Sequence, residues 1–546
     1  MVDIGLVGHW PLQEGCQDRS AFGLRTSNVS VRVGPAAPGG PSSTAAHFDG
    51  VGSHLVVEDH PVLRLGTGEL TVTAWVYTDG KSGDVVGDIV SKFDGEARTG
   101  FGLSVVTNGG VTCTTQANYR HIHWGVDCGQ IEAGWADCGR PGNAVNVTAL
   151  QASEGELYAA TFEAGVEETG HLWQYLGAQQ WQDLGATPDR SNCVSSLTWF
   201  GGALFCCTGR YYPVGSALGE ARNARPGGRV YRVEGDGRWT DCGHPGAEDA
   251  TPEYRPVGGY ETGKADDAMS LTVHNGDLYV TSNHRRGAFR YEGGHTWRYV
   301  GPNERLLSFV VYQQSLYALV NGGSVCRYEG GTDWAFCGCP AGSTQTYSAA
   351  IHGGNLYVGT WPEGEVHRYE GGQEWTNVGR AGYEREIMAM ALYNQKVYLG
   401  GLPMANVYRM DGGRFALVGT LDCTPMVYLR RVWSMAVWKG RLYAGTLPSG
   451  RVWSLGAGAA ATDDRALPPG WHYLSAVRCQ DRLKLYVDGR LASTCTAFVP
   501  ADYDLTCSQP LLIGLGAHTH FCGQMSDVRL YNRALGENEI AQLSGL

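Results

Sequence analysis

Short stretches of alternating apolar and polar residues, separated by glycine-containing turns, run through the middle of the chain. Between residues 347 and 378 they form four consecutive segments: Tyr347–Ile351, Asn355–Thr360, Glu365–Tyr369 and Glu374–Val378. Alternation with a period of two indicates strands, and Gly-Gly or Asn-Gly-type turns between them indicate hairpins. The pattern therefore predicts a unit of four short antiparallel strands.

This unit is repeated along the chain. A Leu-Tyr-like pair follows a polar turn seven times, at Leu157-Tyr158, Leu204-Phe205, Leu278-Tyr279, Leu316-Tyr317, Leu356-Tyr357, Val397-Tyr398 and Leu442-Tyr443. An aromatic-x-x-x-Gly anchor also occurs seven times, at Trp135, Trp181, Trp239, Trp297, Trp334, Trp375 and Phe415. The later copies recur every 37–45 residues. This period predicts a seven-bladed β-propeller rather than a sandwich or a solenoid. The Glu-Gly-Gly-x-x-Trp turns resemble the degenerate Asp-box and kelch turns of known propellers.

The two kinds of anchor are out of phase at the ends of the repeat. Trp135 precedes the first Leu-Tyr pair, whereas the last unit contains Leu442-Tyr443 but no closing Trp. We therefore expect the segment at Trp135 to supply the last strand of the last blade, which leaves no free sheet edge. Such closure brings the two ends of the propeller together, so that it can be inserted into a loop of another domain.

The segments on either side of the repeat look like halves of a second domain. Before it come Val7–Leu12, Ala46–Gly50 and Leu70–Val76, and after it come Gly470–Tyr473, Leu483–Gly489 and Gly523–Leu535. This set, in this order, resembles the laminin G-like, concanavalin A-like jelly roll, and the segment from Phe521 to Leu535 resembles the ending of that family. We therefore expect an all-β protein. Residues 1–116 and 463–546 would form a jelly-roll sandwich, and residues 117–462 an inserted seven-bladed propeller.

Composition removes several functions. The chain has 546 residues, 79 of them glycine, with 42 Lys and Arg against 54 Asp and Glu, which gives a net charge of −12. An acidic chain without a basic run is a poor partner for phosphate backbones or anionic lipid. No apolar stretch approaches the roughly 18 residues of a membrane helix. We therefore expect no nucleic-acid binding and no membrane insertion.

The compartment and the oligomeric state stay open at this stage. The first residues lack the basic and apolar regions of a signal peptide, so the protein either stays inside the cell or begins at a processed end. A glycan-binding function would favour an extracellular or cell-surface setting.

The positions of the cysteines do not predict a disulfide framework. Cys138, Cys242 and Cys337 occupy the same position of the repeat, where sister copies carry Leu or Val. A position that accepts Cys, Leu and Val is a small buried hydrophobe.

The jelly-roll resemblance implies a calcium site beside the sheets. Asp49 and Asp527 are the positions that match, although His54 stands where the family usually has an acidic residue. Calcium takes six to eight oxygen ligands, so backbone carbonyls would supply most of them. The alternative is that Asp49 only shapes a turn and Asp527 only caps a strand. No organic cofactor is expected.

The ligand face of a propeller is built from the loops that lead into each innermost strand and from those between its second and third strands. The first group contributes Asn192, Asp266, Asp267, Thr346, Tyr347, Glu386, Tyr428, Arg430 and Arg431. The second contributes Glu163, Arg210, Tyr211, Tyr212, His284, Arg285, Arg286 and Trp361. The long insertions 209–228 and 244–264 fall on the same face, and long loops on a rigid scaffold are usually where binding occurs.

The chemistry of that face favours an anionic glycan. Aromatic rings stack on sugars, and Arg pairs with carboxylates or sulfates. The alternative is that these side chains are solvated rim residues. A separate stretch carries His121 and His123, which would point to the same side of a strand as paired ligands or an acid/base pair. Its alternative is a linker whose histidines pack between domains.

Three functions fit these observations. The first is a lectin-like, carbohydrate-binding protein that uses the propeller face and the jelly roll, with Tyr212, His284, Arg285, Trp361, Glu386 and Tyr428 as ligand-binding residues. The second is a carbohydrate-active enzyme, above all a polysaccharide lyase, with catalytic candidates His121, His123, Arg210, Tyr211, Tyr347, Arg430 and Arg431. Hydrolysis by paired carboxylates among Asp266, Asp267 and Glu386 is a variant of it. A sialidase is disfavoured because its Phe/Tyr-Arg-Ile-Pro signature is absent. The third is a protein-interaction scaffold, which an apolar ligand face would favour.

Overall fold

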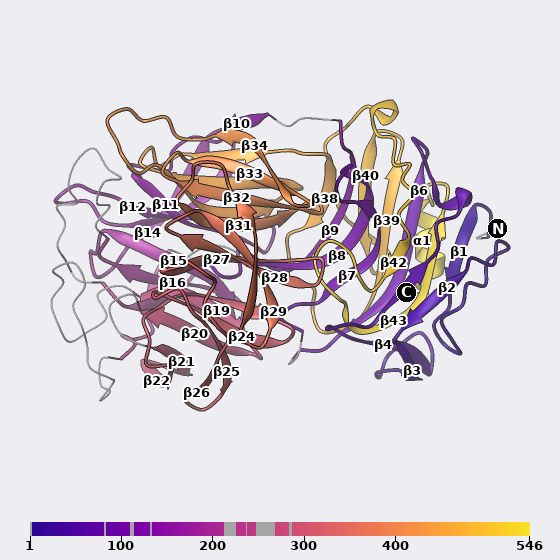
Figure 1. Ribbon diagram of the computed structural model, residues 1–546, viewed down its shortest axis with the longest axis horizontal. Coiled ribbons are helices and arrows are strands. Elements are labelled where there is room, and N and C mark those ends of the chain that lie inside the picture. Colours follow the sequence, from indigo (N-terminus) through magenta and orange to yellow (C-terminus); the bar gives the residue numbers. More distant parts are fainter. Residues whose placement is uncertain are drawn as a thin grey trace.

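A computed structural model describes residues 3–80, 83–109, 114–130, 134–211, 225, 227–235, 237–246, 268–282 and 287–545. Two bodies lie side by side, a two-layered sandwich that holds both chain ends and a larger body of radiating sheets (Figure 1). The described elements are strands apart from one α-helix, α1 (Glu537–Ser544), and two single 3₁₀ turns, Pro61–Leu63 and Pro500–Asp502. The expectation of an all-β protein is therefore confirmed. No helix in the described part of the chain is long and apolar enough to cross a membrane.

The sandwich consists of two antiparallel sheets. The sheet remote from the larger body, here the outer sheet, has the order β3 (Arg32–Pro35), β4 (Thr44–Asp49), β43 (Cys522–Tyr531), β6 (Leu70–Thr78), β39 (Gly470–Cys479), β40 (Arg482–Val487) and β41 (Arg490–Thr494), with β1 (Leu6–Trp10) also paired to β43. The inner sheet has the order β2 (Thr26–Val29), β5 (His54–Val57), β42 (Leu511–Ile513), β7 (Gly87–Asp94), β8 (Thr99–Asn108), β9 (Asn118–Cys128) and β38 (Ala459–Asp463). Alternate apolar side chains such as Leu70, Val72 and Trp124 fill the core between the sheets.

The pairing of β9 with β38 corrects the predicted domain boundaries. Ala459 to Asp463 of β38 lie opposite Val126 to Ile122 of β9, and β9 also pairs along its length with β8. Residues 118–128 and 459–463 therefore belong to the jelly roll, not to the propeller as predicted. The strands of the larger body lie between Trp135 and Leu455.

The larger body is built of four-stranded antiparallel units. Their strands are β11 (Asn146–Ser153), β12 (Glu156–Phe162), β13 (His171–Gly177) and β14 (Gln180–Ala186); β15 (Cys193–Phe200), β16 (Ala203–Gly209), β17 (Val230–Val233) and β18 (Trp239–Asp241); β19 (Ala268–His274), β20 (Asp277–Ser282), β21 (Ala288–Gly293) and β22 (Thr296–Gly301); β23 (Leu306–Tyr312), β24 (Ser315–Val320), β25 (Val325–Gly330) and β26 (Asp333–Phe336); β27 (Gln345–His352), β28 (Asn355–Trp361), β29 (Glu365–Gly371) and β30 (Glu374–Arg380); β31 (Glu386–Tyr393), β32 (Lys396–Leu402), β33 (Asn406–Asp411) and β34 (Arg414–Thr420); β35 (Arg431–Trp438), β36 (Arg441–Leu447), β37 (Val452–Leu455) and β10 (Trp135–Asp137). The first two units join through one bridge, Phe162 to Cys193.

The units are arranged around a ring, as blades of a propeller. The innermost strands β11, β15, β19, β23, β27, β31 and β35 each contact the next, and β35 contacts β11. The early strand β10 pairs with β37, so the segment at Trp135 lies in the same sheet as the last three strands of the repeat.

A tryptophan–carbonyl hydrogen bond explains the repeated anchor. In six units the anchor Trp donates from Nε1 to a backbone carbonyl of the neighbouring unit: Trp135 to Val418 (3.0 Å), Trp181 to Cys138 (2.9 Å), Trp239 to Leu184 (3.3 Å), Trp297 to Cys242 (2.8 Å), Trp334 to Val300 (2.7 Å) and Trp375 to Cys337 (2.7 Å). Phe415, the seventh anchor, has no such donor. The glycine after the acceptor is required by close approach, because a Cβ on Gly338 would lie 2.2 Å from the Gln373 carbonyl oxygen. Cys138, Cys242 and Cys337 are buried free thiols, as predicted.

The connection between β8 and β9 of the jelly roll reaches into the propeller ring. Three amide side chains, on the last residue of β8, in the connection and on the first residue of β9, each pair with both backbone groups of one inner-strand residue. Asn108 pairs with Leu392 of β31 (2.8 and 2.8 Å), Gln116 with Val273 of β19 (2.8 and 2.8 Å), and Asn118 with Val437 of β35 (2.6 and 2.9 Å). Residues 114–118 are fully buried. Because the strands contacted lie on different sides of the ring, this segment fills the ring at the end facing the jelly roll.

Replacing Asn108 with Leu should test this docking. The substitution keeps the size of the side chain but leaves the backbone N–H and C=O of Leu392 buried without partners. We expect the free energy of unfolding in urea to fall by about 2–4 kcal/mol. Asn143→Leu is the matched control, because Asn143 is exposed and should change stability by less than about 0.5 kcal/mol. Equal stability of the two variants would contradict the docking role.

Candidate binding site at the propeller mouth

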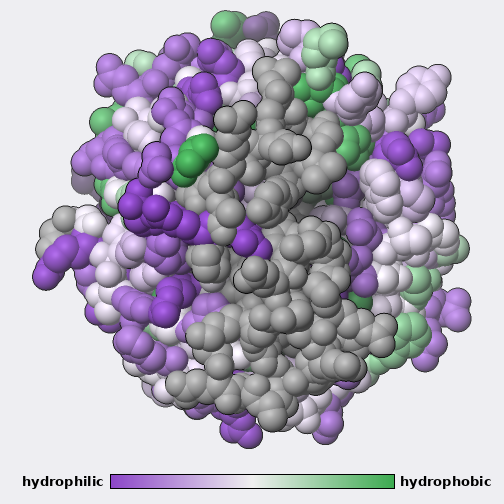
Figure 2. Space-filling view, turned by 90° about the vertical axis from the view of Figure 1, so that its left-hand side faces the viewer, coloured by the Kyte–Doolittle hydropathy of each residue, from purple (hydrophilic) through white to green (hydrophobic). Residues whose placement is uncertain are grey.

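The two ends of the propeller ring have different surroundings. The hairpin turns that follow the inner strands lie against the jelly roll, where buried Lys396 forms an ion pair with Asp127 of β9. The inner strands begin at the opposite end, here called the mouth. An eight-residue strand spans roughly 23 Å, so the mouth is well separated from the jelly roll. Figure 2 views the molecule from this side.

A repeated β-bulge sets which residues lie at the mouth. In all seven inner strands of the described chain the pairing shifts just after the first one or two residues, for instance between Ile387 and Ala389 and between Val432 and Ser434. Bulges re-aim the side chains beside them. One residue lies just before the bulge in each blade, and in the six blades where it is described it is polar except for Cys193. These residues are Asn146, Cys193, Arg305, Gln345, Glu386 and Arg431. The mouth is therefore a mainly polar ring built by the register of the blades.

Tyr211 is held across this ring by an amide clamp. The Asn192 side chain donates to the Tyr211 carbonyl (3.0 Å) and accepts from its backbone N–H (2.8 Å). The Tyr211 ring packs edge-on against Phe162 and Trp433, with centroids 5.3 and 5.5 Å apart. Its hydroxyl lies 3.3 Å from Nη1 of Arg431. Two neighbouring blades and a loop of a third thus fix one phenol beside one guanidinium.

Glu386 is the buried acid of the mouth. Its side chain is 4% exposed, and Oε1 has no hydrogen-bond partner among the described residues. Burial raises the pKa of Glu386 to about 8, even though the positive charge of Arg431 acts in the opposite direction. Burial, and then the charge of Glu386, also raise the pKa of Tyr347 above its ordinary value. Glu386 is therefore largely protonated at neutral pH and can donate a hydrogen bond.

The remaining walls and the floor are aromatic or apolar. The Arg431 guanidinium lies 5.2 Å from the centre of the Trp433 ring. Arg431 Nε and Trp433 Nε1 are buried and, like Glu386 Oε1, lack hydrogen-bond partners in the described part of the chain. Met269 and Met388 form an apolar cluster with Trp433, which Tyr211, Tyr347 and Trp361 extend. Buried polar atoms normally have partners, so these three atoms mark a place where a ligand or water would bind.

The structure brings together several of the predicted residues and separates others. Tyr211, Tyr347, Glu386, Arg431 and Trp361 belong to the mouth cluster. Arg210 precedes Tyr211 at the same end, and Tyr428 is 85% exposed there. The Arg430 side chain instead donates to the Thr424 carbonyl (2.8 Å). The following predicted residues lie outside the described part of the chain: Tyr212, His284, Arg285, Arg286, Asp266 and Asp267.

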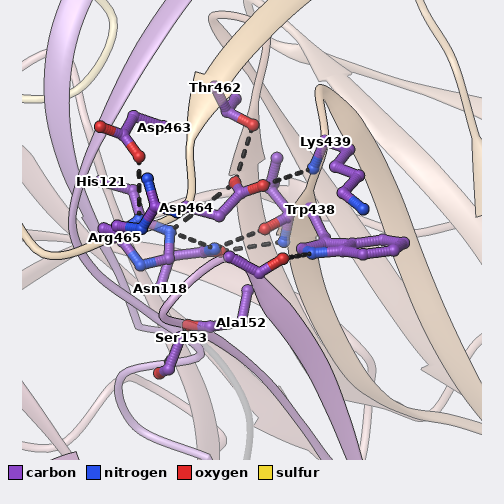
Figure 3. Close-up of polar contacts among 12 residues, drawn as sticks. Asn118, His121, Ala152, Ser153, Trp438, Lys439, Thr462, Asp463, Asp464 and Arg465 are labelled. Atoms are coloured by element: carbon purple, nitrogen blue, oxygen red, sulfur yellow. Dashed lines mark hydrogen bonds and ion pairs between the residues drawn. The ribbon is translucent and has the colours of Figure 1, made fainter. Parts of the chain in front are cut away.

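His121 and His123 are not part of this site, which corrects their prediction as catalytic residues. Both lie on β9 with side chains buried against the propeller, at the end opposite the mouth. Figure 3 shows His121 beside Asn118 and Asp464, with Nδ1 of His121 3.1 Å from the Asn118 amide and 4.0 Å from Asp464 Oδ1. Burial lowers the pKa of each histidine to about 3. They are therefore neutral and pack between the two bodies, as the alternative predicted.

The two predicted calcium ligands lie apart. Asp49 pairs with Cys522 at one end of β43, whereas Asp527 is five residues further along that strand, roughly 17 Å away. Asp49 Oδ1 accepts hydrogen bonds from Val51, Gly52 and Ser53 of its own turn. Asp527 is 2.8 Å from His9 Nε2 and 2.9 Å from Arg529 Nε. The pair does not fit one shared ion, and no group of three His, Cys, Asp or Glu in the described residues is arranged to hold a metal.

Sequence reasoning missed Arg305 and Trp433. Both hold repeat positions equivalent to predicted residues: Arg305 matches Glu386 and Arg431, and Trp433 matches Tyr347. An alignment of the seven repeats on their inner strands contains this signal.

Comparison with known proteins gives one family match. Residues 438–541 match the family described as the concanavalin A-like lectin/glucanases superfamily. The match covers most of the second half of the jelly roll and starts within the last blade. No curated protein matches the chain.

Solved structures show only weak similarity to this chain. The WD40 beta propeller domain of Doa1 is 11% identical with a TM-score of 0.40, covering 59% of this chain and 97% of that one. YCF48 from Cyanidioschyzon merolae is 10% identical with a TM-score of 0.39, covering 59% of this chain and 98% of that one.

The protonation of Glu386 predicts a pH dependence of stability. Because its folded-state pKa is raised from the ordinary value of about 4.3 to about 8, the folded state binds an extra proton in that range. Stability from this group is present at low pH and is lost as pH rises. Glu386→Gln should therefore match wild type near pH 4 and become more stable than wild type by about 4–5 kcal/mol near pH 8.

The measurement is urea unfolding of both proteins over that pH range. Glu374→Gln, an exposed site on β30, is the control and should follow wild type at every pH. A constant difference between Glu386→Gln and wild type would show that Glu386 is ionised in the folded protein.

Proposed function

We propose that the chain is a seven-bladed β-propeller inserted into a concanavalin A-like jelly roll, and that it binds an anionic carbohydrate at the propeller mouth. The observation that carries this proposal is the set of three unpartnered buried polar atoms, on Glu386, Arg431 and Trp433, beside two tyrosines. A sugar offers hydroxyl groups that can bond to the carboxyl of Glu386 and the guanidinium of Arg431. It also offers an apolar ring face to the aromatic side chains.

The charge state of Glu386 explains the preference for an anion. A protonated Glu386 adds no negative charge to the mouth, so the Arg431 guanidinium remains available to a carboxylate or sulfate. Glu386 can at the same time donate to a sugar oxygen. The mouth thus attracts an anionic ligand although the whole chain is acidic.

The jelly roll contributes to binding in a restricted way. Side chains on the propeller-facing side of the inner sheet, such as His121 and His123, are buried. A carbohydrate site on the jelly roll would therefore have to lie on the outer sheet or at an edge. Calcium at Asp49 or Asp527 stays a prediction.

A protein-interaction scaffold is less well supported. In the part of the mouth face that Figure 2 shows in colour, hydrophobic residues form separate spots between hydrophilic ones. A docking face for a protein usually presents a continuous apolar area.

Arg431→Ala should test the binding proposal. Loss of a charge-assisted hydrogen bond costs about 1.5–3 kcal/mol, so affinity for a linear oligouronide should fall by about 10- to 150-fold in isothermal titration calorimetry. Arg368→Ala is the matched control, because Arg368 pairs with Glu370 on the outer part of its blade, and it should leave affinity unchanged. Tighter binding of neutral oligosaccharides than of oligouronides would contradict the anionic assignment.

A polysaccharide lyase is the second candidate, favoured by the contact of the Tyr211 hydroxyl with Arg431. Tyr211, as the phenolate, would take the proton beside the uronate carboxylate, while Arg431 neutralises that carboxylate. The carbon–oxygen bond at C4 then breaks, a C4=C5 double bond forms, and the leaving oxygen takes a proton from Glu386.

Mass spectrometry of oligouronides after incubation distinguishes the two functions. A lyase yields unsaturated products one water lighter than hydrolysis products, and Tyr211→Phe should abolish them while retaining binding. Binding without unsaturated products would leave the mouth as a binding site alone.

A further inference from the structure

Large exposed side chains gather beside the mouth. Of the fourteen exposed large hydrophobic residues in the described chain, the three most exposed are Met426 (91%), Tyr383 (89%) and Tyr428 (85%). Together with Met404 (46%) they lie on loops at the mouth end of the last two blades. We call these four residues the rim.

The rim loops are fixed to one another rather than loose. Buried Glu384 accepts hydrogen bonds from the backbone N–H groups of Met404 (3.1 Å) and Asn406 (3.2 Å). The Arg430 N–H donates to the Pro403 carbonyl (3.0 Å), and Met404 and Arg430 form a parallel bridge. A rigid scaffold that holds aromatic rings in water is typical of a binding surface.

The two rim tyrosines stand in the same relation to the mouth. Tyr383 precedes Glu386 by three residues, and Tyr428 precedes Arg431 by three residues on the neighbouring blade. At most about 11 Å of backbone therefore separates each tyrosine from its mouth residue. Arg385, between Tyr383 and Glu386, lies 4.4 Å above the Trp361 ring and adds positive charge on this path.

The closed far end of the ring determines how a long ligand can lie. Residues 114–118 fill the ring on the jelly-roll side, so a chain held at the mouth cannot pass through and must cross the face. We propose that Tyr383 and Tyr428 are stacking platforms for sugars adjacent to the one at the mouth, and that the ligand is a linear anionic polysaccharide lying over the last two blades. This inference rests on the proposed function.

The test is a size series of linear oligouronides, from the disaccharide upward, titrated into wild type and variants. In wild type, affinity should rise with length. Tyr383→Ala and Tyr428→Ala should each reduce affinity for the longer oligomers by about 3- to 10-fold and leave the shortest oligomer that binds unaffected. Tyr383→Phe and Tyr428→Phe, which keep the ring, should behave like wild type. Phe336→Ala, an exposed aromatic site on β26, controls for loss of any surface ring.

The outcomes separate the two levels of the proposal. Binding that depends on Arg431 but not on length or on the two tyrosines would overturn the rim assignment and keep the mouth site. No binding of any oligouronide to wild type would overturn the proposed function and the rim assignment with it. Self-association of wild type that Tyr383→Ala and Tyr428→Ala abolish, without length dependence, would identify the rim as a contact between copies of the chain and overturn the glycan assignment.

Discussion

The bidentate pairing of three amide side chains with the inner strands is the interaction on which the rest of the structure depends. Asn108, Gln116 and Asn118 each satisfy both backbone groups of a residue that would otherwise be buried without partners. A buried backbone group without a hydrogen-bond partner lowers the stability of the fold, and one with a partner restricts the local geometry. The jelly roll is therefore locked in register with the propeller, and one end of the ring is filled by the protein itself. The mouth becomes a site with one opening.

The contact between the two bodies is polar as well as buried. It includes the Lys396–Asp127 ion pair, and Asp84, which lies 3.1 Å from His274 of the propeller and 2.8 Å from the Tyr119 hydroxyl. Such groups destabilise a misplaced interface because any shift leaves charges or dipoles unpaired. Apolar packing alone would tolerate sliding more readily. This explains how the two bodies keep a defined orientation.

The repeat was readable from the sequence because its anchors have local physical causes. The anchor Trp needs a carbonyl acceptor in the neighbouring unit. The residue four positions after it must be glycine because the neighbouring chain passes too close for a Cβ, so both residues recur wherever two blades meet. The domain boundary was not readable. In β9 the polar residues His121 and His123 alternate with Ile122 and Trp124, as in a strand with one solvent-exposed face. Both faces are in fact buried, one in the sandwich core and one against the propeller, and nothing local in the sequence shows that second burial.

The same distinction applies to the mouth. Tyr211, Tyr347, Glu386 and Arg431 could be predicted as site residues from the loops that carry them. Loops at one end of a propeller lie close together in space however far apart they are in the sequence. The protonation of Glu386 could not be predicted, since it follows from burial in the folded mouth and not from the adjacent sequence. That burial decides the sign of the local charge. With Glu386 ionised the mouth would be near neutral and indifferent to anions, and with Glu386 neutral the Arg431 guanidinium determines what can bind. The net charge of −12 therefore says little about the ligand, because within a buried site a single desolvated carboxyl outweighs charges that water and salt screen elsewhere.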